Sequence, residues 1–123
     1  MKINNIVYAR NVFQKIKDEK IPVKLAWKVV KFLNKTDESV KFYGEKFKGI
    51  VDEFSQKDEN GSPITNGNGF TIIKGKESDC SKAIKELNEL EVDKPEIIFT
   101  LDELDCLQMS ISDMDAISEF IEE

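Results

Sequence analysis

The length, composition and charge of this chain exclude several classes of protein. Its 123 residues are 40% apolar and 34% charged, which predicts a single globular domain over 1–123 and excludes a disordered chain. No run approaches the roughly 20 apolar residues of a membrane span, and residues 1–5 lack the apolar stretch of a secretion signal. We therefore expect a cytoplasmic protein without a membrane contact.

The first half of the chain is predicted to form a helical hairpin. Apolar residues at helical spacing predict a first helix over 6–17, and Pro22 suits the first turn of a second helix. The second helix carries mostly apolar residues at three- and four-residue intervals, which is the pattern of a heptad seam. The seam residues are Ala26, Val29, Leu33, Thr36, Val40, Tyr43, Phe47, Ile50 and Phe54.

The continuity of this second helix is left open. Residues 22–56 form either one helix or two, because Thr36 could cap a new helix and the glycines Gly44 and Gly49 each cost about 1 kcal/mol in a helix interior. We favour one continuous or slightly kinked helix.

The partner of the seam is also left open. It packs either in the core of the protein or against a second copy in a homo-oligomer, and we favour the core because so small a chain has few other large apolar faces. The seam residues that we expect to be mostly buried are Phe47, Ile50 and Phe54. Three aromatic residues lie off the seam and either close a second side of the core or contact a partner: Trp27, Phe32 and Phe42.

The second half of the chain is predicted to mix strands with helices. Residues 57–69 break the helical pattern, and their Asn-Gly pairs favour the turn of a short β-hairpin between 62–65 and 70–73. A helix over 78–90, capped by Ser78, is expected to follow.

The chain is then predicted to return to strand and to end in a helix. Residues 96–100 are predicted to be a strand, with 107–111 as its partner or neighbour, and Ser112 is expected to cap a final helix over 113–121. These elements predict an α+β fold. It consists of an N-terminal helical hairpin with a long helix, a small antiparallel β-sheet and a closing C-terminal helix.

Side chains that commonly carry catalysis are scarce. The chain has no histidine, which removes the usual activating base and the commonest metal ligand. Cys80 and Cys106 lie too far apart for a CxxC motif, so we interpret both as buried, unbridged thiols of a reducing compartment. We predict a protein that is not an enzyme, with no catalytic residues, no metal and no cofactor.

Charge is distributed unevenly along the chain. Residues 1–50 hold 12 Lys or Arg against five acids, whereas residues 95–123 hold nine acids and no base. We predict that the acidic end is a partner-binding surface made of Asp102, Glu103, Asp105, Glu119, Glu122 and Glu123. Two alternatives remain open. The lysine-rich second helix could neutralise these acids within the fold, or the acids near residue 103 could serve a metal or an enzymatic reaction.

The lysines of the second helix form a candidate basic face. They recur at intervals of four and three residues and so share one side of the helix: Lys24, Lys28, Lys31 and Lys35. Such a face is either a solvated helix surface or a stripe for phosphate and nucleic acid. We favour the solvated surface, because the chain carries a net charge of −6, and we do not expect direct nucleic-acid binding.

Three segments together resemble a known group of proteins. They are Lys-Ile-Pro-Val-Lys-Leu-Ala at 20–26, Lys-Asp-Glu-Asn-Gly at 57–61, and 112–123, which ends in Phe-Ile-Glu-Glu. In this order the chain resembles a family of small uncharacterised proteins encoded by bacteriophages and prophages of Firmicutes. The motifs are helix starts, turns and a terminal helix, and they carry no catalytic residue. The resemblance implies a phage-encoded accessory protein of the host cytoplasm.

These observations lead to two expectations about function. The first is a non-enzymatic phage protein that acts by protein–protein interaction and inhibits a host defence or regulatory protein through its acidic surface. The alternative is a chaperone of tail or head assembly, or a minor structural protein, that oligomerises through the heptad seam.

Overall fold

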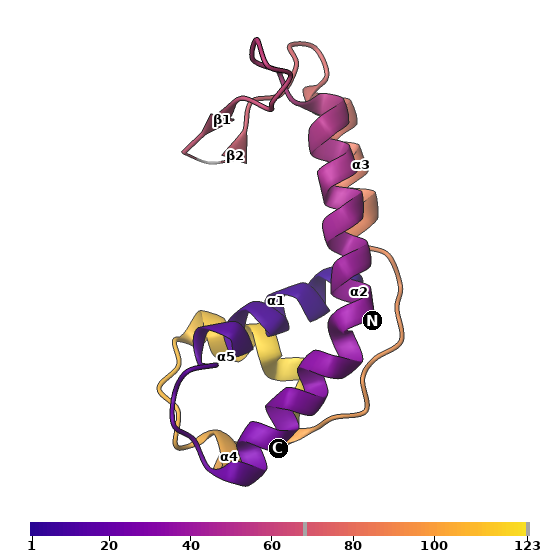
Figure 1. Ribbon diagram of the computed structural model, residues 1–123. Coiled ribbons are helices and arrows are strands. Elements are labelled where there is room, and N and C mark those ends of the chain that lie inside the picture. The colour runs from indigo at the N-terminus through magenta and orange to yellow at the C-terminus, as the bar shows by residue number, and fades with distance from the viewer. Residues whose placement is uncertain (68, 123) are drawn as a thin grey trace.

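The computed structural model describes residues 1–67 and 69–122, which are arranged along one long helix (Figure 1). The helical elements in chain order are α1 (Ile3–Lys15), α2 (Val23–Phe54), α3 (Glu77–Asn88), α4 (Leu101–Leu104), α5 (Ile111–Ile117) and the 3-10 turn η1 (Ser118–Phe120). The strands are β1 (Thr65–Asn66), β2 (Gly69–Phe70), β3 (Phe99–Thr100) and β4 (Ile121–Glu122). The α+β class is confirmed, with helices in the majority. No described helix is long and apolar enough to cross a membrane.

The long helix α2 links two unlike ends of the molecule. Figure 1 shows α1, α4 and α5 grouped beside its N-terminal half, whereas α3 and the β1–β2 hairpin accompany its C-terminal half. Helix α2 runs over 32 residues without interruption, so the prediction of one helix is confirmed. Gly44 and Gly49 lie inside it with open space around the position of a Cβ atom, so neither glycine is required by close packing.

The hydrophobic core lies at the end that contains α1 and α5. Phe13 of α1 and Phe32 of α2 meet edge to face with ring centroids 5.0 Å apart, and Phe99 and Phe120 complete the cluster at 5.1 Å from Phe13 and 4.9 Å from Phe32. All four rings are fully or almost fully buried. Burial of large aromatic side chains supplies much of the stabilisation of a small domain.

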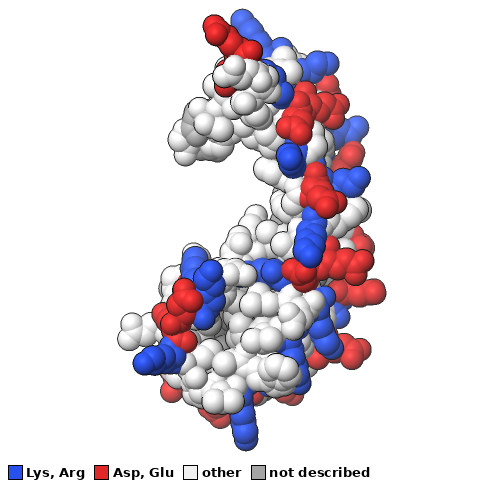
Figure 2. Space-filling view, in the orientation of Figure 1, with Lys and Arg blue, Asp and Glu red and all other residues white. Residues whose placement is uncertain are grey.

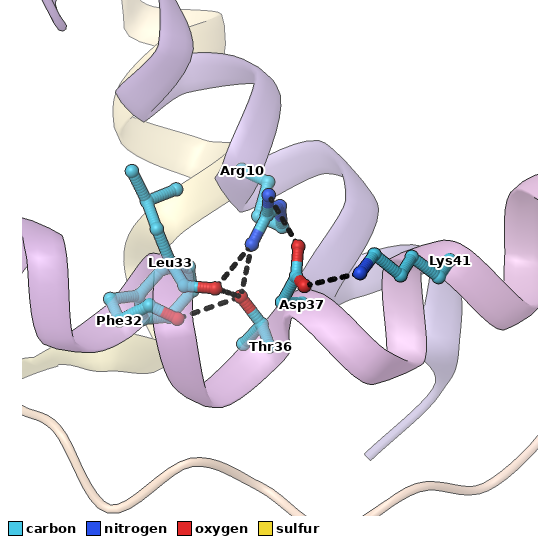
Figure 3. A network of polar contacts seen from close by, with 6 residues as sticks. All are labelled: Arg10, Phe32, Leu33, Thr36, Asp37 and Lys41. Carbon is cyan, nitrogen blue, oxygen red and sulfur yellow. Dashed lines mark hydrogen bonds and ion pairs between the residues drawn. The ribbon is translucent and has the colours of Figure 1, made fainter.

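A polar network fixes α1 against the middle of α2 (Figure 3). The guanidinium of Arg10 donates to the carbonyl oxygen of Leu33 at 2.5 Å and to the hydroxyl of Thr36 at 3.0 Å, and it lies 3.7 Å from the carboxylate of Asp37. Lys41 pairs with the same carboxylate at 3.2 Å. Because the Arg10 side chain is largely buried, it satisfies polar atoms at a helix–helix contact that water reaches poorly.

The heptad seam coincides only partly with the buried face of α2. The buried residues of the helix are Leu25, Val29, Phe32 and Thr36, of which only Val29 and Thr36 belong to the seam. The prediction that the seam residues Phe47, Ile50 and Phe54 are mostly buried is wrong, because all three are only half-buried. The C-terminal half of α2 extends past the core, where α3 packs beside it (Figure 1).

Part of the seam lies at the contact between α2 and α3. The hydroxyl of Tyr43 on α2 donates to Asn88 on α3 at 2.6 Å, and the Tyr43 ring stacks on Phe47. Burial, and to a smaller degree the nearby Tyr8, raises the pKa of the Tyr43 phenol. Of the off-seam aromatics, Phe32 is buried in the core, whereas Trp27 and Phe42 are exposed.

The strands differ from the prediction at the C-terminal end. The antiparallel hairpin is present as β1 and β2, although Asn68 of its predicted turn lies outside the described residues. The strand predicted over 107–111 is wrong. Strand β3 pairs instead with β4, in parallel, because η1 returns the end of the chain to lie beside Phe99 and Thr100.

The predicted helix caps also need correction. Ser110, not Ser112, caps α5, since its hydroxyl oxygen accepts the N–H of Asp113 at 3.0 Å. Ser78 lies inside α3, which begins at Glu77 without a side-chain cap. The final helix predicted over 113–121 is shorter than expected, because α5 gives way to η1 and then to β4. Cys80 and Cys106 are not bridged to each other. Cys80 is buried as predicted, whereas the prediction that Cys106 is buried is wrong, because its side chain is exposed.

Candidate partner-binding groove

The acids of the C-terminal segment fall into two groups. Glu103 belongs to the first, because its carboxylate pairs with the ammonium of Lys28 at 2.7 Å. The same ammonium donates to the carbonyl oxygen of Ile98 at 2.8 Å, so this pair ties the start of α4 to α2. For Glu103 the lysine-rich helix does neutralise the acid within the fold.

Asp113 is also held inside the fold. Its carboxylate accepts a hydrogen bond of 2.9 Å from the ammonium of Lys15, at the end of α1. This hydrogen bond from Lys15 lowers the pKa of the Asp113 carboxyl against the opposing effect of partial burial, and the cap residue Ser110 adds to the lowering. The contact joins α5 to α1 at the core end of the molecule.

The other acids remain on the surface. Asp102, Asp105 and Asp115 are exposed, and within residues 1–67 and 69–122 no lysine or arginine forms an ion pair with any of them. Glu119 accepts a hydrogen bond from Asn5 at 3.2 Å and stays exposed, as does Glu122. Glu123 lies outside the described residues. Among the described residues, most acids of the predicted surface therefore have no basic partner, and Glu103 is the exception.

An apolar groove opens between these exposed acids. It consists of two open hollows, of about 370 and 350 Å³, that adjoin at Leu101 and Met114. We call it the C-terminal groove and define it by its apolar lining residues Leu101, Leu107, Met109, Ile111, Met114 and Ile121. Asp105 and Asp115 line its two hollows, so carboxylates stand beside apolar side chains.

The most exposed large apolar side chain in the described part of the chain lies in this groove. Ile111 is 90% exposed and Leu101 is 54% exposed. Each is the first residue of a helix, and each follows a capping residue: Thr100 accepts the N–H of Glu103, and Ser110 accepts that of Asp113. The caps fix the helix starts, and the first helical residue then projects away from the core.

The groove combines apolar side chains with neighbouring carboxylates. Covering a fully exposed isoleucine is worth about 1.5–3 kcal/mol, and methionines such as Met109 and Met114 adapt to differently shaped partners. Among the described residues, no group of three His, Cys, Asp or Glu side chains is placed to hold a metal ion.

The predicted basic face is divided by the fold. Lys28 is engaged by Glu103, whereas Lys24, Lys31 and Lys35 are exposed. Lys31 holds its ammonium 5.5 Å from the centre of the Trp27 ring. Figure 2 shows basic and acidic side chains interspersed along the outer side of the molecule.

Sequence reasoning located the acids of this region but missed the groove. The alternation over 107–111 predicts a strand, so the pattern does not indicate that a helix begins at Ile111. The available signal was the pair of hydroxyl caps at Thr100 and Ser110, each followed at once by a large apolar residue.

Comparison with known proteins found no matching family model, no similar curated protein and no similar solved structure.

Proposed function

We propose that this is a non-enzymatic protein that acts by protein–protein interaction through the C-terminal groove and the acids around it. The observation that carries the proposal is Ile111, 90% exposed in an apolar groove whose neighbouring carboxylates have no ion-pair partner among the described residues. A monomer gains nothing from leaving such a side chain in water, whereas a partner that covers it gains binding energy.

The partner that fits this surface is a protein segment with apolar anchors and basic neighbours. Apolar anchors suit the side chains of Leu101 and Ile111, and basic residues suit Asp102, Asp105 and Asp115 at the margins. The charges steer association and give specificity, while the apolar contact supplies most of the affinity. Such a surface suits an inhibitor that occupies a basic patch of its target.

The biological setting of the proposal follows the resemblance of segments 20–26, 57–61 and 112–123. We assign the interaction to a phage-encoded accessory protein in the host cytoplasm, with a host defence or regulatory protein as its target. The alternative of virion assembly by oligomerisation through the seam is weaker in this geometry, because Tyr43 and Phe47 of the seam pack where α3 meets α2.

Two synthetic helical peptides test the proposal. Both carry leucines at positions i, i+4 and i+7, and the remaining positions are rich in lysine in one peptide and in glutamate in the other. We expect the protein to bind the lysine peptide and not the glutamate peptide, and Ile111→Glu to weaken binding about 10- to 100-fold. Phe42→Glu is the matched control, because Phe42 is an exposed apolar residue on α2 outside the groove.

The acids are tested in the same assay. Reversing Asp102 and Asp105 to lysine should slow association with the lysine peptide and remove most of its salt dependence. Glu103 is left unchanged in this variant, because its pair with Lys28 is structural. Equal binding of the two peptides, or binding that Ile111→Glu leaves intact, would contradict the proposal. Capture from host lysate with wild type but not with Ile111→Glu would then identify the natural partner.

A further inference from the structure

A second exposed apolar surface lies on the N-terminal end of α2. Val23, Trp27 and Val30 recur at i, i+4 and i+7 and so share one helix face, where they are 83%, 57% and 42% exposed. This face is turned away from the buried residues Leu25 and Val29 of the same helix. We call the three residues the Trp27 stripe. Neither the core nor the proposed function uses them.

The segment that carries the Trp27 stripe is basic. Residues 20–36 contain five lysines and no acid. Lys24 and Lys31 are exposed beside the stripe, and the Lys31 ammonium lies over the indole ring at 5.5 Å. The stripe is therefore a helix face with apolar anchors and lysine neighbours. That is the chemistry which the C-terminal groove accepts.

The stripe and the groove lie at the same end of the molecule. The pair between Lys28 and Glu103 joins the N-terminal half of α2 to α4, and α4 begins with the groove residue Leu101. Two copies related by a twofold axis can then each place a stripe on the groove of the other, so that every contact occurs twice.

We propose that the Trp27 stripe of one copy binds the C-terminal groove of a second copy, which gives a homodimer whose groove is masked until a partner displaces the stripe. The inference rests on the proposed function in taking the groove as a binding surface, and it adds the regulation of that surface. Charge complementarity within one chain carries it: lysines without acids over 20–36, and acids without bases over 95–123.

An anionic membrane is a poorer occupant of the stripe. The chain has a net charge of −6, and the exposed carboxylates of Asp102 and Asp105 lie on α4 and its C-terminal cap, at the same end as the stripe, where they would be repelled by such a surface. The paired contacts are small, so we expect a weak dimer, with a dissociation constant of about 10–100 μM.

Sedimentation of the full chain, from about 1 μM to about 1 mM, tests the inference. We expect a shift from monomer to dimer over this range, and a weaker dimer in high salt. Trp27→Glu and Ile111→Glu should each raise the dissociation constant at least about tenfold. Both side chains are exposed, so both variants should fold, and circular dichroism and melting curves confirm this. Phe42→Glu, about 22 Å farther along α2 at about 1.5 Å per residue, is the control and should dimerise normally.

An equimolar mixture of Trp27→Glu and Ile111→Glu gives the sharpest result. The intact stripe of the second variant can bind the intact groove of the first, so the mixture should form a heterodimer held by one of the two contacts. It should associate more strongly than either variant alone and more weakly than the wild type. A wild type that stays monomeric to the highest concentration overturns the inference, and so does a mixture that associates no more strongly than the two variants do alone. The peptide assay, performed at low concentration where the protein is monomeric, decides the proposed function separately.

Discussion

The two halves of α2 have similar apolar periodicity but different surroundings. Around the N-terminal half, α1 and the segments that contain Phe99 and Phe120 close a core in which Phe32 is fully buried. Around the C-terminal half, α3 packs against the helix, and Phe47 is half-buried. An apolar seam therefore marks a helix face that can pack against other segments. How deeply that face is buried depends on which later segments of the chain fold back against the helix.

The largest expected effect contrasts one phenylalanine from each half. Phe32→Ala should lower the free energy of unfolding by about 3–5 kcal/mol, because it removes the ring that contacts Phe13 and Phe120 in the core. Phe47→Ala should cost about 1–2 kcal/mol, because much of that ring is already in contact with water. Denaturant unfolding of both variants checks the contrast, and equal losses would contradict it.

The next effect concerns the contact that holds α1 at the middle of α2. Arg10→Met should cost about 1–3 kcal/mol, since it leaves the hydroxyl of Thr36 and the carbonyl of Leu33 with fewer partners in a poorly hydrated site. Lys41→Met tests the outer part of the same network and should change stability by less than about 0.5 kcal/mol, because that ion pair is exposed. If Lys41→Met proves as costly as Arg10→Met, the network is not anchored at Arg10.

A smaller effect should distinguish an acid that stabilises the fold, Glu103, from an acid that contacts the partner, Asp102. Glu103→Gln should destabilise the protein by about 1–2 kcal/mol, because it breaks a partly buried pair with Lys28, and should leave peptide binding nearly unchanged. Asp102→Asn should do the reverse, slowing peptide association without a change in melting temperature. Thermal melts and association rates measured on the same samples check this. Identical behaviour of the two variants would remove the distinction between the two groups of acids.

The smallest effect is a pH dependence at the contact between α1 and α5. Lys15 lowers the pKa of Asp113 in the folded state, so this contact stabilises the protein above the ordinary aspartate pKa. That stability is lost as the pH falls through the lowered pKa of the folded protein. In Lys15→Met the Asp113 pKa, followed by NMR, should move up toward its ordinary value. A titration that is unchanged in the variant would show that Lys15 does not hold the carboxylate.

The helical half of the fold could be predicted from the sequence because its signals are local. The apolar spacing of α2 persists through Gly44 and Gly49, and the helix is continuous there. The depth of burial could not be predicted, since Leu25 and Phe32 lie off the seam and are covered by segments about 70 to 90 residues away in sequence, among them those containing Phe99 and Phe120.

The candidate site was predicted only in part for a related reason. The excess of acids over 95–123 is visible in the sequence, but the pairing of Glu103 with Lys28 depends on a contact across 75 residues. The parallel pairing of β3 with β4 also joins distant segments, and two-residue strands leave almost no pattern to recognise. Ile111 was not recognised as the start of a helix, because its alternating surroundings are typical of a strand and only the cap at Ser110 indicates a helix.

The most direct test of the central claim is a map of amide NMR shifts when the lysine-rich peptide is added to the labelled full chain. We expect the perturbed residues to lie between Leu101 and Ile121, around the C-terminal groove, and the shifts to be much smaller in Ile111→Glu at the same peptide concentration. Perturbations centred instead on the other end, around Tyr43, Phe47 and the hairpin, or no perturbation at a peptide concentration of about 1 mM, would contradict it.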